Sequence, residues 1–114
     1  MICKRLDVTI NSDGRKEINQ FKILRTLGKG AQGKVKKARN TLNNEYYAIK
    51  ILKAKRIGNI EEFKREIAIK KKLYHKNTIY LYEVIEDEAR KKFYLVLDYM
   101  DVGPFLEAKF WKYE

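Results

Sequence analysis

Three glycines, Gly28, Gly30 and Gly33, stand within the stretch TLGKGAQGKVKKARN (residues 26–40) at a spacing that could place a loop over phosphate groups. Glycine has no Cβ, so its backbone can approach a ligand closely and present N–H groups to phosphate oxygens. The G-x-G-x-x-G spacing is a weak indicator by itself, because the same pattern occurs in turns that bind nothing. The surrounding elements must therefore decide between a phosphate-binding loop and a flexible basic hairpin.

A lysine inside an apolar run is the second candidate for chemistry. Lys50 lies in YAIKIL, residues 47–52, and the alternation of a strand leaves this lysine partly buried whichever face it occupies. A buried ammonium is costly unless a counter-charge accompanies it. Glu66 is the candidate partner, because it lies among the apolar residues of the stretch 60–73. Each residue alone has an ordinary interpretation, a lysine that extends to solvent and a surface glutamate, but together with the glycines a pair is favoured.

Periodic apolar residues predict the elements that must position these groups. A helix is indicated by Ile60, Phe63 and Ile67, which fall on one face, with two acidic residues at its start, as the helix dipole prefers. Asparagines at 43–44 suit a tight turn, and the polar residues 1–20 are interpreted as a flexible leader. The order is β-β-β-α-β-β, an antiparallel sheet with one helix, with strands at 21–28, 33–39, 46–52, 79–86 and 92–100 and the helix at 60–73.

This order restricts what the glycines can be. A dinucleotide-binding fingerprint requires the glycines to open a helix, and the pattern after Gly33 is that of a strand. A Walker P-loop requires Gly-Lys-Ser/Thr, which does not follow. What remains is a glycine-rich hairpin that could fold over phosphates.

The net charge of +11, from 26 Lys and Arg against 15 Asp and Glu, is the main compositional feature. A basic domain can bind nucleic acid through phosphate contacts. The lysines are spread over the chain without interleaved aromatic residues, so a solvated lysine-rich surface is favoured. The 114 residues suit one domain. A single cysteine, Cys3, and the lack of a long apolar run lead us to expect a cytoplasmic protein without a membrane segment.

Taken together, these features resemble the N-terminal lobe of a eukaryotic protein kinase. LGKGAQGKV is similar to the kinase glycine-rich loop, YAIK to the lysine-bearing strand, and FYLVLDYM to the last strand and the hinge. The stretch that begins with REIAIKKKL resembles helix C. The resemblance covers about residues 17–107. It implies an α+β fold with a five-stranded antiparallel sheet and one main helix (helix C), the C-terminal lobe being absent. The implied divisions are a leader at 1–20, the ATP-binding lobe at 21–107, and a tail or truncated start of the C-terminal lobe at 108–114.

The resemblance also implies a role for each matching residue. Lys50 would hold the α- and β-phosphates of ATP and Glu66 would fix Lys50 in place. Leu97 would be the gatekeeper beside the pocket, and the backbone of Asp98 and Met100 would bind the adenine edge. The other implied contacts are the packing of Leu27, Val35 and Ala48 on the adenine and the phosphate-covering loop of Gly28, Lys29, Gly30, Ala31, Gln32, Gly33 and Lys34.

A finer resemblance, through VGPFLE with Gly103, Pro104 and Glu107, is to the calcium/calmodulin-dependent protein kinase kinases. Another calmodulin-kinase-like or Ser/Thr kinase is the alternative. The implied partners are ATP, Mg²⁺ in the complete kinase, a protein substrate, and calmodulin or a partner kinase.

Several departures from the kinase pattern bear on activity. Lys70 occupies a position that is usually apolar in kinases, and it lies four residues after Glu66, where it could compete with Lys50. Lys76 replaces the proline of the family motif, and Gln32 stands where an aromatic residue is common. No H-R-D-x-x-x-x-N, D-F-G or A-P-E occurs in the sequence, so no metal ligand is assigned and these residues alone are expected to be inactive.

Three functions remain open at this point. The first is the ATP-binding lobe of a Ser/Thr kinase, present as a partial kinase. The second is a stand-alone regulatory module that binds without catalysis. The third and least favoured is a basic nucleic-acid-binding domain.

Overall fold

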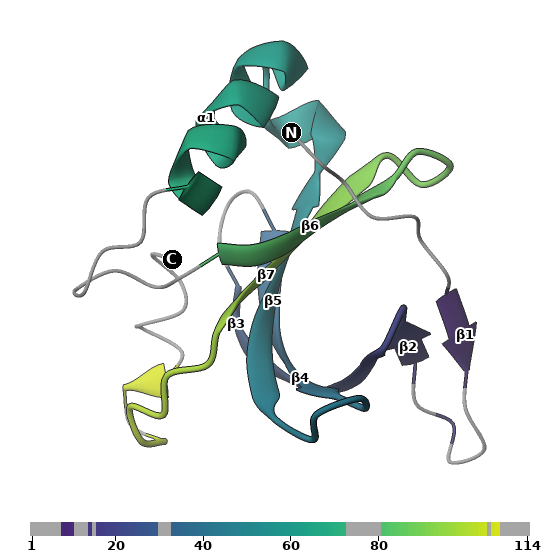
Figure 1. Ribbon diagram of the computed structural model, residues 1–114, viewed down its shortest axis with the longest axis vertical. Coiled ribbons are helices and arrows are strands. Elements are labelled where there is room, and N and C mark those ends of the chain that lie inside the picture. Colours follow the sequence, from purple (N-terminus) through teal and green to yellow (C-terminus); the bar gives the residue numbers. More distant parts are fainter. Residues whose placement is uncertain are drawn as a thin grey trace.

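The computed structural model describes residues 8–10, 14, 16–29, 33–72, 81–104 and 106–107. Within these residues, seven strands form one antiparallel sheet and one α-helix lies against it (Figure 1). The order across the sheet is β1-β2-β3-β4-β5-β7-β6. The strands are β1 (Val8–Ile10), β2 (Lys16–Ile18), β3 (Phe21–Lys29), β4 (Gly33–Asn40), β5 (Tyr46–Lys53), β6 (Leu81–Asp87) and β7 (Lys92–Asp98). The helices are a 3₁₀ turn, η1 (Ala54–Arg56), and α1 (Ile60–Lys72).

The predicted α+β fold is confirmed, and the five predicted strands correspond to β3–β7. The two additional strands lie in the leader, where the sequence indicated only a flexible segment. β2 pairs with β3 through Ile18 and Phe21, and Ile18 is fully buried. Strands of three residues carry too little alternation to be recognised from periodicity.

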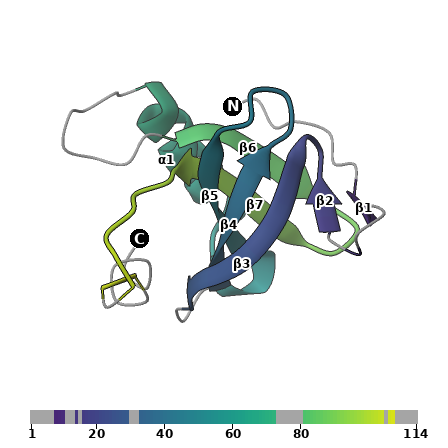
Figure 2. The ribbon, with the colours of Figure 1, turned by 90° about the horizontal axis from the view of Figure 1, so that it is seen from below.

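The sheet is curled (Figure 2). Side chains are buried on both of its faces. The cleft-side cluster lies on the face that packs against α1, and the outer cluster lies on the opposite face. Strand β5 supplies both, with Ala48 and Leu52 in the cleft-side cluster and Tyr47 and Ile49 in the outer cluster. The cleft-side cluster comprises Leu27, Val35, Ala48, Leu52, Ile67, Leu81, Val84, Phe93 and Leu97. The outer cluster comprises Ile18, Phe21, Ile23, Ala38, Tyr47, Ile49, Ile85, Tyr94 and Val96.

Strand β3 changes face along its length. Its apolar residues Phe21, Ile23 and Leu27 have the same parity, so regular alternation would place all three on one face. The structure puts Phe21 and Ile23 in the outer cluster and Leu27 in the cleft-side cluster. Two register shifts in the pairing with β4, between Ile23 and Gly28, cause this switch. The irregularity delivers Leu27 to the face where Lys50 lies.

Helix α1 spans residues 60–72, which confirms the predicted helix. Asn59 caps its start, because the Asn59 side-chain oxygen accepts the backbone N–H of Glu62 at 3.0 Å. Phe63 packs edge-on against Phe93 of β7, with ring centroids 5.1 Å apart, and Ile67 is buried against the sheet. These contacts fix the helix face that looks towards β5 and β7. Among the described helices, none is both long enough and apolar enough to span a membrane.

Candidate functional site

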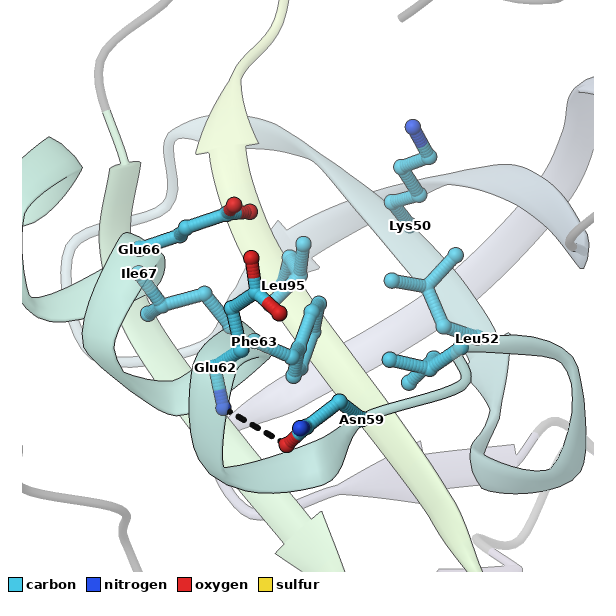
Figure 3. Close-up of a pocket in the computed structure, with 9 residues that line it drawn as sticks. Lys50, Leu52, Asn59, Glu62, Phe63, Glu66, Ile67 and Leu95 are labelled. Atoms are coloured by element: carbon cyan, nitrogen blue, oxygen red, sulfur yellow. Dashed lines mark hydrogen bonds between the residues drawn. The ribbon is translucent and has the colours of Figure 1, made fainter.

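A cavity of about 410 Å³ lies between α1 and the sheet. Figure 3 shows its walls, with α1 on one side and β5 on the other. Phe63 and Leu95 supply apolar surface, and the charged groups are Lys50, Glu62 and Glu66. A mixed lining of this kind is typical of ligand sites, which combine apolar surface with a few placed polar groups. The full lining is Lys50, Leu52, Ile57, Asn59, Glu62, Phe63, Glu66, Ile67 and Leu95.

Lys50 and Glu66 face this one cavity from opposite walls (Figure 3). Lys50 comes from the middle of β5 and is half-buried, while Glu66 comes from α1 and is exposed. Among the nine lining residues, all of them described, Figure 3 draws a hydrogen bond only between Glu62 and Asn59. The structure thus places Lys50 and Glu66 in the lining of one cavity, and their pairing stays a prediction.

The glycine hairpin, formed by β3 and β4, lies beside the strand that carries Lys50. Val35 of β4 is the register partner of both Gly28 in β3 and Lys50 in β5, so the hairpin and the lysine are held by consecutive pairings. Lys29 and Lys34 pair at the end of the described hairpin and are both exposed. The predicted loop residues Gly30, Ala31 and Gln32 lie outside the described residues.

Gly33 has a structural requirement that the sequence did not reveal. A Cβ built on Gly33 would meet the backbone oxygen of Ile51 at 1.7 Å, far inside van der Waals contact. Gly33 is therefore needed for the close approach of β4 to β5, whatever it does towards a ligand. The close approach fixes the base of the hairpin next to the strand that carries Lys50.

The four residues predicted to surround the adenine lie together. Leu27, Val35, Ala48 and Leu97 all belong to the cleft-side cluster, and Ala48 pairs with Leu97 between β5 and β7. Each of the four is at most 4 % exposed. Little of these side chains is open to solvent in this structure, so the predicted base-binding face is closed here.

The hinge residues differ in how they are held. The hydroxyl of Tyr82 in β6 donates to the carboxylate of Asp98 at 2.6 Å, which fixes Asp98 at the end of β7. Met100, two residues further on, is 47 % exposed. The backbone of this segment runs away from the sheet after β7, as Figure 1 shows.

A charged contact that the sequence did not predict joins β3 to the segment after β7. Arg25 Nη1 and Nη2 donate to the two carboxylate oxygens of Glu107 at 2.5 and 2.7 Å. The hydrogen bond from Arg25 holds the pKa of Glu107 below its ordinary value and raises that of Arg25. No local pattern could reveal this contact, because the residues are 82 positions apart.

A second unpredicted contact lies beside it. The ammonium of Lys37 in β4 lies 4.4 Å from the ring centre of Tyr46 and 4.6 Å from that of Tyr99. A cation over an aromatic face is attracted by the ring's negative centre. Lys37 thereby connects β5 to the residue that follows Asp98.

Besides Gln32, two further departures from the family pattern lie outside the described side chains. The side chain of Lys70 lies outside the described part of α1, and residues 75–77 lie outside the described residues altogether. In the part of the chain that is described, no group of three or more His, Cys, Asp or Glu side chains could hold a metal ion.

Comparisons with known proteins show the family of the chain. The family profile of the protein kinase domain matches residues 21–110. The chain is 43 % identical over 112 residues to the serine/threonine-protein kinase ssp1 of Schizosaccharomyces pombe, covering 90 % of this chain and 17 % of that protein. It is 40 % identical over 103 residues to SNF1-activating kinase 1 of Saccharomyces cerevisiae, covering 78 % of this chain and 9 % of that protein. It is also 46 % identical over 91 residues to calcium-dependent protein kinase 5 of Plasmodium falciparum, covering 80 % of this chain and 15 % of that protein. The chain thus spans less than a fifth of the length of these relatives.

Proposed function

Because the chain belongs to the protein kinase domain family and corresponds to its N-terminal part, we propose that it forms the ATP-binding lobe of a Ser/Thr protein kinase. In the complete enzyme the reaction would transfer the γ-phosphoryl group of ATP to a Ser or Thr hydroxyl. The observation that supports this best is the position of Lys50. It pairs with Val35 of the glycine hairpin and lines the same cavity as Glu66.

The described residues suit the phosphate groups of ATP but supply no metal site of their own. Lys50 would contribute a positive charge to the α- and β-phosphates, and the hairpin would present backbone N–H groups. In the part of the chain that is described, no acidic cluster could hold Mg²⁺. Mg²⁺ would neutralise phosphate charge when bound, through ligands that the complete enzyme supplies.

Glu66 would act as a positioning residue for Lys50. The two residues already face one cavity, so a movement of α1 towards β5 would bring the carboxylate to the ammonium. In a partly buried site such a pair is stabilised more than in water, because the local dielectric is lower. Lys70, four residues after Glu66, would compete for the same carboxylate.

The substrate would be another protein kinase. The name of one relative, SNF1-activating kinase 1, describes a kinase that activates SNF1, and the segment with Gly103, Pro104 and Glu107 resembles the calcium/calmodulin-dependent protein kinase kinases. A calcium-dependent protein kinase is also among the relatives, so a calcium-regulated kinase with a different substrate is the alternative.

A lysine substitution tests the proposed reaction. In the complete protein, Lys50→Met is expected to lower phosphoryl transfer at least about 100-fold, since a positioned charge is lost at the phosphates. The matched control is Lys53→Met, an exposed lysine near the end of the same strand, which should stay within about twofold of wild type. Full activity of Lys50→Met would contradict the assignment. Binding of RNA or DNA that falls steeply with salt and is unaffected by Lys50→Met would favour the nucleic-acid alternative.

The size of the native protein separates the kinase from the stand-alone module. An antibody against these residues should detect a protein several times larger than 13.6 kDa if the chain is one lobe of a kinase. A native protein of 13.6 kDa would instead favour a non-catalytic module, because the sequence has none of the catalytic-loop or metal-binding motifs.

A further inference from the structure

The hinge segment, described at residues 98–104 and 106–107, is held by side chains from three strands of the sheet. Tyr82 of β6 holds Asp98, Lys37 of β4 lies against Tyr99, and Arg25 of β3 holds Glu107. The first two contacts act where the segment leaves β7. The third acts at its far end.

The contact between Arg25 and Glu107 is specific in its geometry. Two guanidinium nitrogens donate to two carboxylate oxygens, at 2.5 and 2.7 Å, and such a two-point contact fixes direction as well as distance. The carboxylate is the better shielded partner, since the side chain of Glu107 is 17 % exposed against 52 % for Arg25. Most exposed ion pairs contribute little, but a bidentate geometry is the exception.

The contact joins two parts of the proposed nucleotide site. Arg25 lies two residues before Leu27 and three before Gly28, so it belongs to the strand that begins the glycine hairpin. Glu107 lies at the end of the segment that carries the predicted adenine-binding backbone. The register shifts of β3 between Ile23 and Gly28 interrupt its regular pairing with β4 around Arg25. The strand is therefore less firmly held by its neighbour at this point, and the contact to Glu107 supplies an additional connection.

From this geometry we infer that Arg25 and Glu107 are positioning residues, which form a latch between the glycine hairpin and the end of the hinge segment. The inference rests on the proposed function, because it names what the latch positions. With the latch closed, the hairpin and the hinge segment move together, and a bound nucleotide is retained. With the latch broken, the hairpin lifts independently and the nucleotide leaves faster. The chemistry at Lys50 is not altered.

Kinetics of the complete protein test the latch. Arg25→Met and Glu107→Gln are each expected to raise the KM for ATP about three- to tenfold with kcat within about twofold, because binding and not the chemical step is weakened. The double variant Arg25→Glu/Glu107→Arg should bring the KM back to within about twofold of wild type, since the reversed pair can form the same contact. The matched control is Arg39→Met, because Arg39 of β4 bonds Asn44 at 3.0 Å in the β4–β5 turn and does not reach the hinge segment.

The latch is overturned if the single variants leave the KM unchanged, or if the reversed pair is no better than either single variant. Hydrogen exchange of the amides at 98–107 gives a second readout that needs no activity. Exchange should be faster in Arg25→Met than in Arg39→Met, and equal exchange would overturn the latch. If wild-type protein transfers no phosphate, the proposed function fails, and hydrogen exchange still decides the latch alone.

Discussion

At the scale of single residues, Gly33 shows that a glycine in a motif can be required for two separate reasons. Its place in G-x-G-x-x-G suggested close approach to phosphates, and the structure adds close approach to the backbone of Ile51. The close approach to Ile51 requires glycine at this position even when no ligand is bound. A loss of activity on substitution of Gly33 would therefore not demonstrate phosphate contact.

A Gly33→Ala variant is expected to destabilise the protein by about 1–3 kcal/mol, because the added methyl forces β4 away from β5. Urea denaturation measures the loss. The matched control is Lys34→Ala, an exposed neighbour on the same strand, which should change the free energy of unfolding by less than about 0.5 kcal/mol. Equal stability of the two variants would show that the strands can separate without cost.

Local sequence predicted some residues of the candidate site and could not predict others. Lys50 and Glu66 were identified because an apolar context makes a charged residue conspicuous, and the structure brings both to one cavity. Arg25 was not identified, because an exposed arginine has no such context and its partner is 82 positions away. The contacts of Lys37 with two aromatic rings were not predicted, because Lys37 is one of many lysines in the sequence.

At the scale of elements, the predicted strands were confirmed where alternation extended over about four residues or more. The predicted helix was confirmed where helical periodicity extended over about two turns or more. β1 and β2 were missed because each has three residues. The switch of face in β3 was missed because a bulge depends on the partner strand, and the sequence of one strand does not contain it.

The strand β2 gives a prediction about the leader. Ile18→Ala should cost about 2–5 kcal/mol of folding free energy, because Ile18 is fully buried in the outer cluster and its loss leaves a cavity. Thermal or urea denaturation measures the difference. Leu42→Ala, which removes a side chain that is 82 % exposed in the β4–β5 turn, should be nearly neutral. If both variants were equally stable, β2 would contribute nothing to the outer cluster.

At the scale of the whole molecule, the sheet is stabilised by packing on both faces, with one cluster on each face. The outer cluster holds β5 and β7 from one side, while the cleft-side cluster and α1 hold them from the other. The residues of the predicted nucleotide site that the structure describes in a cluster all lie on the cleft side. The residues predicted to pack on the base, which include Val35 and Ala48, are buried in this structure, so binding of a base there would have to expose them.

This closure predicts weak nucleotide binding by these 114 residues alone. We expect a Kd for ATP of about 1 mM or weaker, which corresponds to only about −4 kcal/mol. Titration calorimetry with the 114-residue chain measures it, with Lys50→Met as the control for a specific site. Micromolar binding that is lost in Lys50→Met would show that the base-binding face opens readily and that the chain needs no further lobe to hold ATP.

The packing of strand β5 on two faces limits which mutations the protein can tolerate there. Its odd and even positions serve different faces, with Ile49 in the outer cluster and Lys50 at the cavity. Substitutions of similar size at these positions alter packing locally. Deletion of one codon between Tyr46 and Ile49 would instead move every later residue of the strand to the other face. The lysine would enter the apolar interior and an isoleucine would take its place at the cavity. Viable alleles should therefore contain point changes in β5 but no single-codon gains or losses.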